Sequence, residues 1–250
     1  MIRSRFLSVI GAAGLCVAAG SAGATPLNLE YLGPQSGYRT LQIVESPVDP
    51  IGGGALPDNV LAGAFDMLDT TPGSLLGNFV AWCLDLTSWL GTGSGITYPY
   101  ETTDTPFSNS YGLDASEMAR VQGLFDANYF EGLADDRNRS AGFQMALWEV
   151  LYDDDYSLTN NTAANDDFRG VAGYGAGSAF ALAESYLTAA AAYDDGRQWN
   201  LLFLESQSGK QNLVTVSAVP LPAAGLLLLT GLAGLAFAGR RRKAAVAASV

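Results

Sequence analysis

Hydrophobic positions change their spacing along the chain, from a strand-like pattern to a helical one and back. Between residues 27 and 111, runs rich in β-branched and aromatic residues alternate with Gly and Pro clusters, which is typical of strands separated by turns. The run at 79–86 is apolar on both faces, as expected of a central strand, and it places Cys83 on one face with Phe79 and Ala81. The strands that we expect in this region cover residues 38–45, 75–86 and 95–101.

Helical spacing begins near Asp114. This residue and Glu117 have the spacing of a capping box, in which two side chains bond free backbone groups at the start of a helix. Residues 140–152 predict a buried amphipathic helix that Ser140 or Asn138 would cap. The remaining elements that we expect are a helix at 178–193 and a hairpin of strands at 198–204 and 211–217.

One polar residue, Gln144, interrupts the apolar stripe of the helix predicted at 140–152. The stripe runs at helical spacing through Ala141, Gln144, Trp148 and Leu151. A buried amide without hydrogen-bond partners is costly, so this position needs an explanation. Either Gln144 bonds a neighbouring backbone, or its side-chain carbonyl is bonded to a cysteine.

Together these elements predict a single domain of the α+β class at 25–217. Strands before and after about three helices would form a β-barrel or a sandwich, with the helices packed to one side. The length of 250 residues suits one such domain with targeting segments at its ends.

The N-terminal pattern is that of a secretory signal peptide at residues 1–24. Arg3 and Arg5 precede an apolar run, and small residues follow at the cleavage site. A lipoprotein is the alternative, but Leu15 stands where a small residue would precede Cys16. Cleavage after residue 24 would leave Cys83 as the only cysteine and so exclude an intramolecular disulfide.

A Pro-containing pentapeptide, an apolar run and a basic cluster follow one another near the C-terminus. The run at 224–239 is near the lower limit of roughly 17 residues for a transmembrane helix. The basic cluster would lie in the cytoplasm, with the short tail at 244–250. The residues concerned are Val219, Pro220, Leu221, Pro222, Ala223, Arg240, Arg241 and Arg242.

Residues 218–243 closely resemble the VPLPA-CTERM variant of the PEP-CTERM sorting signal. The resemblance implies recognition by an exosortase-type membrane protease, which would cut near 220–223. Until that cut, the C-terminal helix would hold the protein in the membrane. A plain single-pass anchor is the alternative.

Charge and composition exclude several functions. All 25 acidic residues but only seven of the 13 basic ones lie between Glu30 and Lys210, which leaves that region at 7 minus 25, or −18. Such a surface argues against nucleic acid as a partner. The chain has no histidine, which removes Ser-His-Asp and Cys-His catalysis and histidine-based zinc sites. We expect neither an enzyme nor a cofactor; an extracellular hydrolase with paired carboxylates is a distant alternative.

Residues 153–167 form an acidic, Asn-rich stretch after the helix of Gln144. The three aspartates at 153–155 suggest a calcium loop, but the EF-hand pattern needs Gly and Glu where Leu158 and Ala164 stand. We therefore expect a mobile, solvated loop and no metal site. An irregular calcium site remains the alternative.

The remaining candidates for chemistry are Cys83 and Gln144. Cys83 lies between Trp82 and Asp85 in a short motif of the predicted strand, and Gln144 opens a Gln-x-x-x-Trp motif that ends at Trp148. The pair resembles the thioester domains of bacterial surface adhesins. The resemblance implies that the two side chains join with loss of ammonia, with Trp82, Asp85 and Trp148 around the bond. Gln144 would supply an acyl group, and Cys83 the leaving thiolate, for attack by surface amines or hydroxyls.

Two functions are consistent with these residues. The first is an exported adhesive protein of the cell surface or extracellular matrix that attaches covalently through a Cys83–Gln144 thioester. The second is a non-covalent structural or binding module with a buried free Cys83 and the same sorting route. In both, the protein crosses the inner membrane, is anchored by its C-terminal helix and reaches the surface or the medium after processing.

Overall fold

The computed structural model describes residues 24–50, 56–73, 76–103, 107, 109, 113–159 and 168–217. The predicted signal peptide up to residue 23, the sorting signal with its transmembrane helix at 218–243 and the tail at 244–250 lie outside these residues. Among the helices in the described part of the chain, none is both long and apolar enough to span a bilayer.

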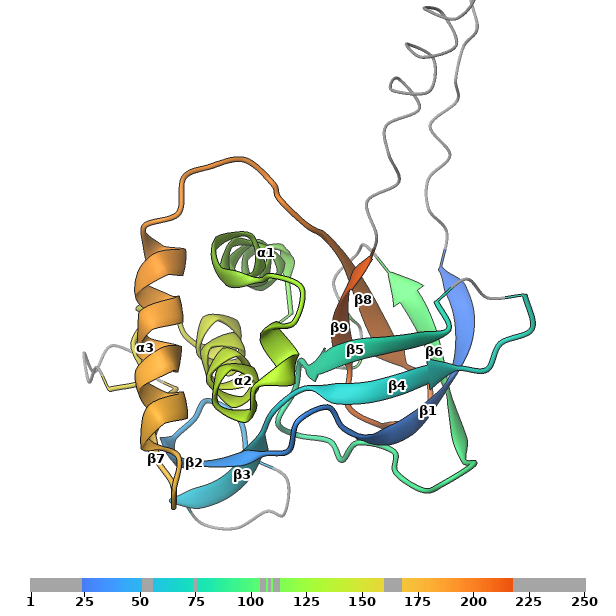
Figure 1. Ribbon diagram of the computed structural model, residues 1–250, viewed down its shortest axis with the longest axis horizontal. Coiled ribbons are helices and arrows are strands. Elements are labelled where there is room, and N and C mark those ends of the chain that lie inside the picture. Colours follow the sequence, from blue (N-terminus) through green and yellow to red (C-terminus); the bar gives the residue numbers. More distant parts are fainter. Residues whose placement is uncertain are drawn as a thin grey trace, which may run out of the picture.

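Six antiparallel strands form a closed barrel in the order β1-β4-β5-β9-β8-β6 (Figure 1). The barrel closes where β1 pairs with β6, with Leu27 opposite Tyr100. Of the two architectures predicted, a barrel or a sandwich, the structure adopts the barrel. The strands are β1 (Thr25–Pro34), β4 (Phe65–Asp69), β5 (Asn78–Cys83), β6 (Thr97–Thr103), β8 (Asn200–Ser206) and β9 (Leu213–Ser217). The predicted β8–β9 hairpin turns at Gly209, whose φ of 67° favours glycine.

A second, smaller sheet has three strands in the order β3-β2-β7. They are β2 (Arg39–Glu45), β3 (Asp58–Ala62) and β7 (Arg169–Ala172), all paired antiparallel. This sheet was not predicted as a separate unit, because β3 and β7 are short and their patterns are only partly apolar. It lies beneath the helices in Figure 1, and both β2 and β3 contact α2.

Three helices pack to one side of the barrel, as predicted (Figure 1). They are α1 (Ala115–Asn128), α2 (Arg137–Tyr152) and α3 (Gly177–Ala191), with a short 3-10 turn η1 (Leu133–Asp135) before α2. The predicted capping box of α1 is confirmed. The Asp114 carboxylate accepts from the Glu117 N–H, and the Glu117 carboxylate accepts from the Asp114 N–H at 2.8 Å. The fold is therefore of the α+β class.

The central helix of this layer is α2, which is buried on every side from residue 140 to residue 152. Its neighbours are α1, α3 and the β2–β3 edge of the smaller sheet. The predicted buried helix at 140–152 is confirmed, but it is not amphipathic, because other elements cover its remaining face as well. At Gly142 the contact with α3 is close: a Cβ there would lie 2.6 Å from the carbonyl oxygen of Ala179.

The start of α2 also differs from the prediction of Ser140 or Asn138 as its cap. Asp136 is the N-cap, and its carboxylate accepts hydrogen bonds from the N–H groups of Asn138 and Arg139. Ser140 lies inside the helix, where its hydroxyl accepts from the Ala64 N–H at 2.8 Å. The hydroxyl of Ser140 therefore ties the helix to the chain just before β4.

Candidate functional site

The structure brings Cys83 and Gln144 into direct contact, although they are 61 positions apart. Cys83 is the last residue of β5, and Gln144 lies in the middle of α2; both are fully buried. The backbone N–H of Cys83 donates to Oε1 of Gln144 at 2.9 Å. In return, Nε2 of Gln144 donates to the Cys83 carbonyl oxygen at 2.8 Å. The buried amide therefore has its partners in the backbone of the cysteine itself.

These two hydrogen bonds also fix the orientation of the Gln144 side chain. With an oxygen and a nitrogen each held by the same residue, the amide plane cannot rotate without breaking both bonds. The N–H of Cys83 polarises the amide carbonyl, and it would stabilise negative charge that develops on Oε1. The electrophilic carbon is thus held beside the residue that carries the thiol.

The Cys83 thiol donates to the carbonyl oxygen of Asp85 at 2.7 Å. Burial raises the pKa of this thiol well above its usual value, and the nearby Asp85 charge raises it further. The indole N–H of Trp148 has no partner that meets hydrogen-bond geometry, but it approaches the thiol closely enough to act on its pKa in the opposite direction. At neutral pH the sulfur is therefore protonated.

The Asp85 side chain anchors the chain just beyond β5. Its carboxylate accepts from the Asn212 N–H at 2.7 Å and from the Ser88 N–H at 3.2 Å, while burial raises its pKa to about 6. Leu86 follows, and its N–H donates to the Tyr152 hydroxyl at 2.9 Å. Because these bonds replace the strand ladder, β5 ends at Cys83 and not at residue 86 as predicted.

A cavity of about 620 Å³ opens to one side of this contact. Cys83 and Trp148 line it, and aromatic side chains that include Tyr31 and Phe65 form part of its wall. Trp89, at 70% exposure, also lines the cavity and connects it to the surface. A small ligand group therefore has a route from solvent to the cysteine.

The three residues predicted to surround the pair are not equivalent. Trp148 lines the cavity, and Asp85 holds the chain beside Cys83 through the bonds above. Trp82 does not line the cavity; its ring packs against those of Phe125, Tyr129 and Phe143, with centroids 5.3–5.8 Å away. Trp82 therefore joins β5 to α1 and α2 as part of the aromatic core.

A second group of polar side chains lies at the far end of α2, and one member was not identified from the sequence. Glu149 lies against Asp153 and Asp155, with one carboxylate oxygen from each residue within 4.8 Å of the others. The spacing of Glu149 and Asp153, two acids one helical turn apart at a helix end, was the available signal. The predicted acidic loop is described only as far as Thr159, so its predicted mobility at 160–167 stays a prediction.

No family model and no curated protein sequence matches this chain. Among solved structures, it is similar to the N-terminal thioester domain of a surface protein from Clostridium perfringens, with a TM-score of 0.40 and 12% identity over 78% of this chain and 100% of that one. It is also similar to the N-terminal domain of the Streptococcus pyogenes pilus tip adhesin Cpa, with a TM-score of 0.39 and 15% identity over 77% and 99% of the two chains. A third similar structure is the N-terminal thioester domain of fibronectin-binding protein SfbI from Streptococcus pyogenes, at 0.38 and 15% over 77% and 98%. With these scores, the case for a function rests on the contacts of Cys83 and Gln144 themselves.

Proposed function

We propose that this protein attaches covalently to surface amines or hydroxyls through an internal thioester between Cys83 and Gln144. The observation that carries the proposal is the pair of hydrogen bonds, at 2.9 and 2.8 Å, that holds the Gln144 amide on the backbone of Cys83. A packing role for the two residues requires neither this shared backbone nor a cavity that reaches the cysteine.

The first step forms the thioester. In the structure, the Cys83 thiol donates a hydrogen bond to the Asp85 carbonyl oxygen. To react, the sulfur turns away from this oxygen and attacks the side-chain carbon of Gln144. The S–H bond and the C–N bond break, an S–C bond forms, and the thiol proton leaves with the amide nitrogen as ammonia. During the attack, the Cys83 N–H stabilises the negative charge on Oε1. Holding the two groups together supplies the proximity that free thiols and amides lack.

The second step consumes the thioester. An amine enters through the cavity and attacks the same carbon; a C–N bond forms, the C–S bond breaks, and the amine proton returns to the Cys83 sulfur. The product is an amide tether, or an ester when a hydroxyl attacks. Two features favour this step over hydrolysis: the aromatic wall that includes Trp148, and the net charge of −18 between Glu30 and Lys210, given by 7 basic and 25 acidic residues, which attracts cationic amines.

Intact mass of the exported protein, which lacks residues 1–24 and so has Cys83 as its only cysteine, tests the first step. Wild type should weigh one ammonia less than its sequence and should resist thiol alkylation when it is denatured briefly. Cys83→Ala keeps the backbone bonds to Gln144, so it should fold and show the full mass. Gln144→Ala should show the full mass with an alkylatable thiol, whereas Gln198→Ala, at an exposed position, should keep the deficit.

Methylamine tests the second step. Methylamine should add to Gln144 of wild type, so that the protein gains the mass of one methylamine. The reaction should also release the Cys83 thiol, which then becomes open to alkylation. Wild type that has the full mass and a thiol that alkylates on denaturation would overturn the thioester.

The route to the surface is part of the same proposal. The signal peptide at 1–24 would direct export, and an exosortase-type protease would process the segment at 218–243. Surface material should then yield no peptides beyond about residue 223. Abundant mature protein that still contains Arg240 to Arg242 would contradict the cleavage.

A second candidate is a non-covalent structural or binding module in which Cys83 stays a free thiol. The observation in its favour is that every partner the amide needs is already provided, and that the raised pKa keeps the thiol protonated. The mass experiment separates the two candidates, because this module would show no loss of ammonia.

A further inference from the structure

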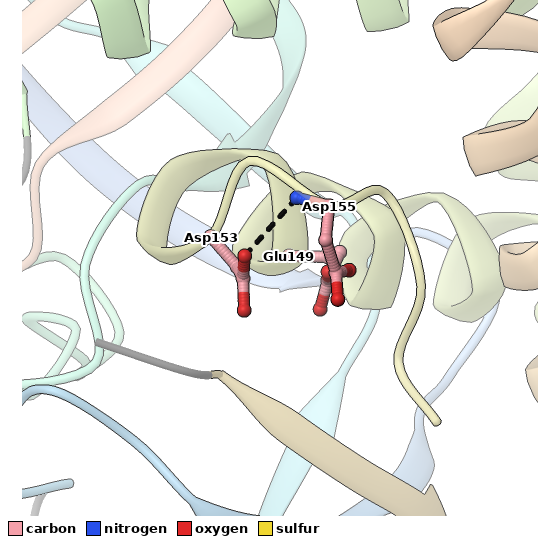
Figure 2. Close-up of side chains that lie close together, drawn as sticks. All are labelled: Glu149, Asp153 and Asp155. Carbon is pink, nitrogen blue, oxygen red and sulfur yellow. Dashed lines mark hydrogen bonds between the residues drawn. The ribbon is translucent and has the colours of Figure 1, made fainter. Parts of the chain in front are cut away.

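Carboxylates converge at the C-terminal end of α2, away from the cavity of Cys83. Figure 2 shows Glu149, Asp153 and Asp155 pointing the same way from the end of the helix and the turn that follows. One oxygen from each lies within 4.8 Å of the others. Backbone groups fix two of them: Asp153 accepts from the N–H groups of Asp155 at 3.1 Å and Phe168 at 3.1 Å, and Asp155 accepts from Ser157 at 2.8 Å.

Glu149 is the exceptional member of this group. Its side chain is 0% exposed, and one of its oxygens, Oε1, accepts from the Ser157 N–H at 3.0 Å. The other, Oε2, is buried with no hydrogen-bond partner, and Figure 2 shows the Glu149 carboxylate beside that of Asp155. A buried carboxylate oxygen without a partner is costly, so this atom indicates a missing ligand.

No positive charge in the described part of the chain compensates these acids. The ion pairs among the described residues join Arg120 to Glu117 and Arg169 to Glu45, and neither includes the group at the end of α2. The carbonyl end of a helix is partly negative, and at this end Arg120 from α1 donates to the Val150 carbonyl oxygen at 2.7 Å. The three carboxylates have no such partner among the ion pairs of the described residues, so they favour a cation.

We infer that Glu149, Asp153 and Asp155 bind a divalent cation of the calcium type. Oxygen ligands alone suit a hard cation, and Ca²⁺ accepts the irregular geometry of a helix end and a turn, whereas Mg²⁺ demands a near-ideal octahedron. The cation would join the end of α2 to the turn at Asp155 and, through Asp153, to Phe168 just before β7. This inference does not depend on the thioester.

Calcium titration of the full-length protein tests it. After treatment with chelator, the protein is melted in increasing calcium chloride, with sodium chloride at matched ionic strength as reference. We expect a saturable rise in Tm of about 5 to 10 °C once free calcium exceeds its Kd about 100-fold. Equilibrium dialysis with radioactive calcium should give one bound ion per chain.

Matched variants locate the ion. Glu149→Gln and Asp155→Asn should each remove the rise in Tm and the bound ion, whereas Asp154→Asn, an equal change of charge at an exposed neighbour, should keep both. The mass deficit of the thioester, where present, should be the same in all three. Wild type without a saturable rise, or equal losses in Asp154→Asn, would overturn the site.

Discussion

Gln144 and Glu149 are both buried polar side chains of α2, but their surroundings satisfy them differently. Both polar atoms of the Gln144 amide bond the backbone of Cys83. Only one oxygen of Glu149 is bonded, and the other is buried without a partner. The complete set of bonds orients a group for reaction with a neighbour that is already present. The incomplete set indicates a ligand that comes from outside the chain.

The nearby carboxylates differ in the same way. Asp85, beside Cys83, is buried but accepts hydrogen bonds from two backbone N–H groups, those of Asn212 and Ser88. The carboxylates around Glu149 face one another. Replacing Gln144 by an apolar residue should therefore destabilise the protein. Replacing Glu149 by glutamine should instead stabilise the calcium-free protein.

The largest effect is expected from Gln144→Ala. It leaves the N–H and the carbonyl oxygen of Cys83 buried without partners and opens a cavity in α2. We expect the free energy of unfolding to fall by about 3 to 5 kcal/mol, measured by urea denaturation. Gln144→Met fills the space without the two bonds, so it should recover only the cavity part. Equal stability of Gln144→Met and wild type would show that the bonds contribute nothing.

Gly142→Ala tests whether the close packing of α2 against α3 keeps both Gln144 and Glu149 in position. The added Cβ would meet the Ala179 carbonyl at 2.6 Å, so α2 and α3 must separate. We expect the free energy of unfolding to fall by about 2 to 3 kcal/mol. Calcium should bind more weakly, and a smaller fraction of the protein should show the mass deficit. Gly123→Ala on α1 is the control, because a Cβ there meets nothing within 4 Å and should gain up to about 1 kcal/mol.

The pH dependence of stability should reveal Asp85. Burial raises its pKa from 3.8 to about 6, so the folded state holds this proton more tightly than the unfolded state does. The contribution is complete below pH 3.8 and is lost as the pH rises through about 6. Relative to Asp85→Asn, wild type should lose about 2 kcal/mol of unfolding free energy across this window in urea titrations. Parallel curves for the two proteins would contradict the shift.

The smallest effect is expected from Glu149→Gln in chelator. Glutamine keeps an acceptor for the Ser157 N–H and removes a carboxyl group whose pKa is raised to about 9 by burial and by the charge of Asp153, a shift that costs stability at neutral pH. The calcium-free protein should gain about 1 to 2 kcal/mol by thermal or urea unfolding. Asp154→Asn should change it by less than about 0.5 kcal/mol. A loss of stability in Glu149→Gln would mean that Glu149, like Gln144, stabilises the protein without calcium.

The features that the sequence predicted correctly depend on neighbours in the chain. The capping box of Asp114 and Glu117 needs only a spacing of three residues, and the structure contains it. The apolar run around Cys83 predicted a buried strand because strand alternation is equally local. Gln144 was identified because an amide stood on an apolar stripe.

What the sequence missed depends on contacts between distant residues. Alternation predicts a strand but not its partner, so it could not choose between a sandwich and the barrel that β1 closes with β6. The helix at 140–152 was predicted to be amphipathic, because the elements that cover the rest of α2 lie elsewhere in the sequence. Serine is a common helix-capping residue, but the Ser140 hydroxyl accepts a hydrogen bond from the Ala64 N–H instead.

The strand pairing of β5 also sets an order of events during synthesis. Cys83 is paired with Leu213 of β9, and the Asp85 carboxylate that follows it is held by Asn212, 127 positions later. Contacts this distant form late, after the chain has lost the entropy of a long loop. The pocket around Cys83 is therefore complete only when β9 has been made. The acylation that we propose would begin at that moment, so the nascent chain would carry an unreactive thiol and amide past the many amines of the cell.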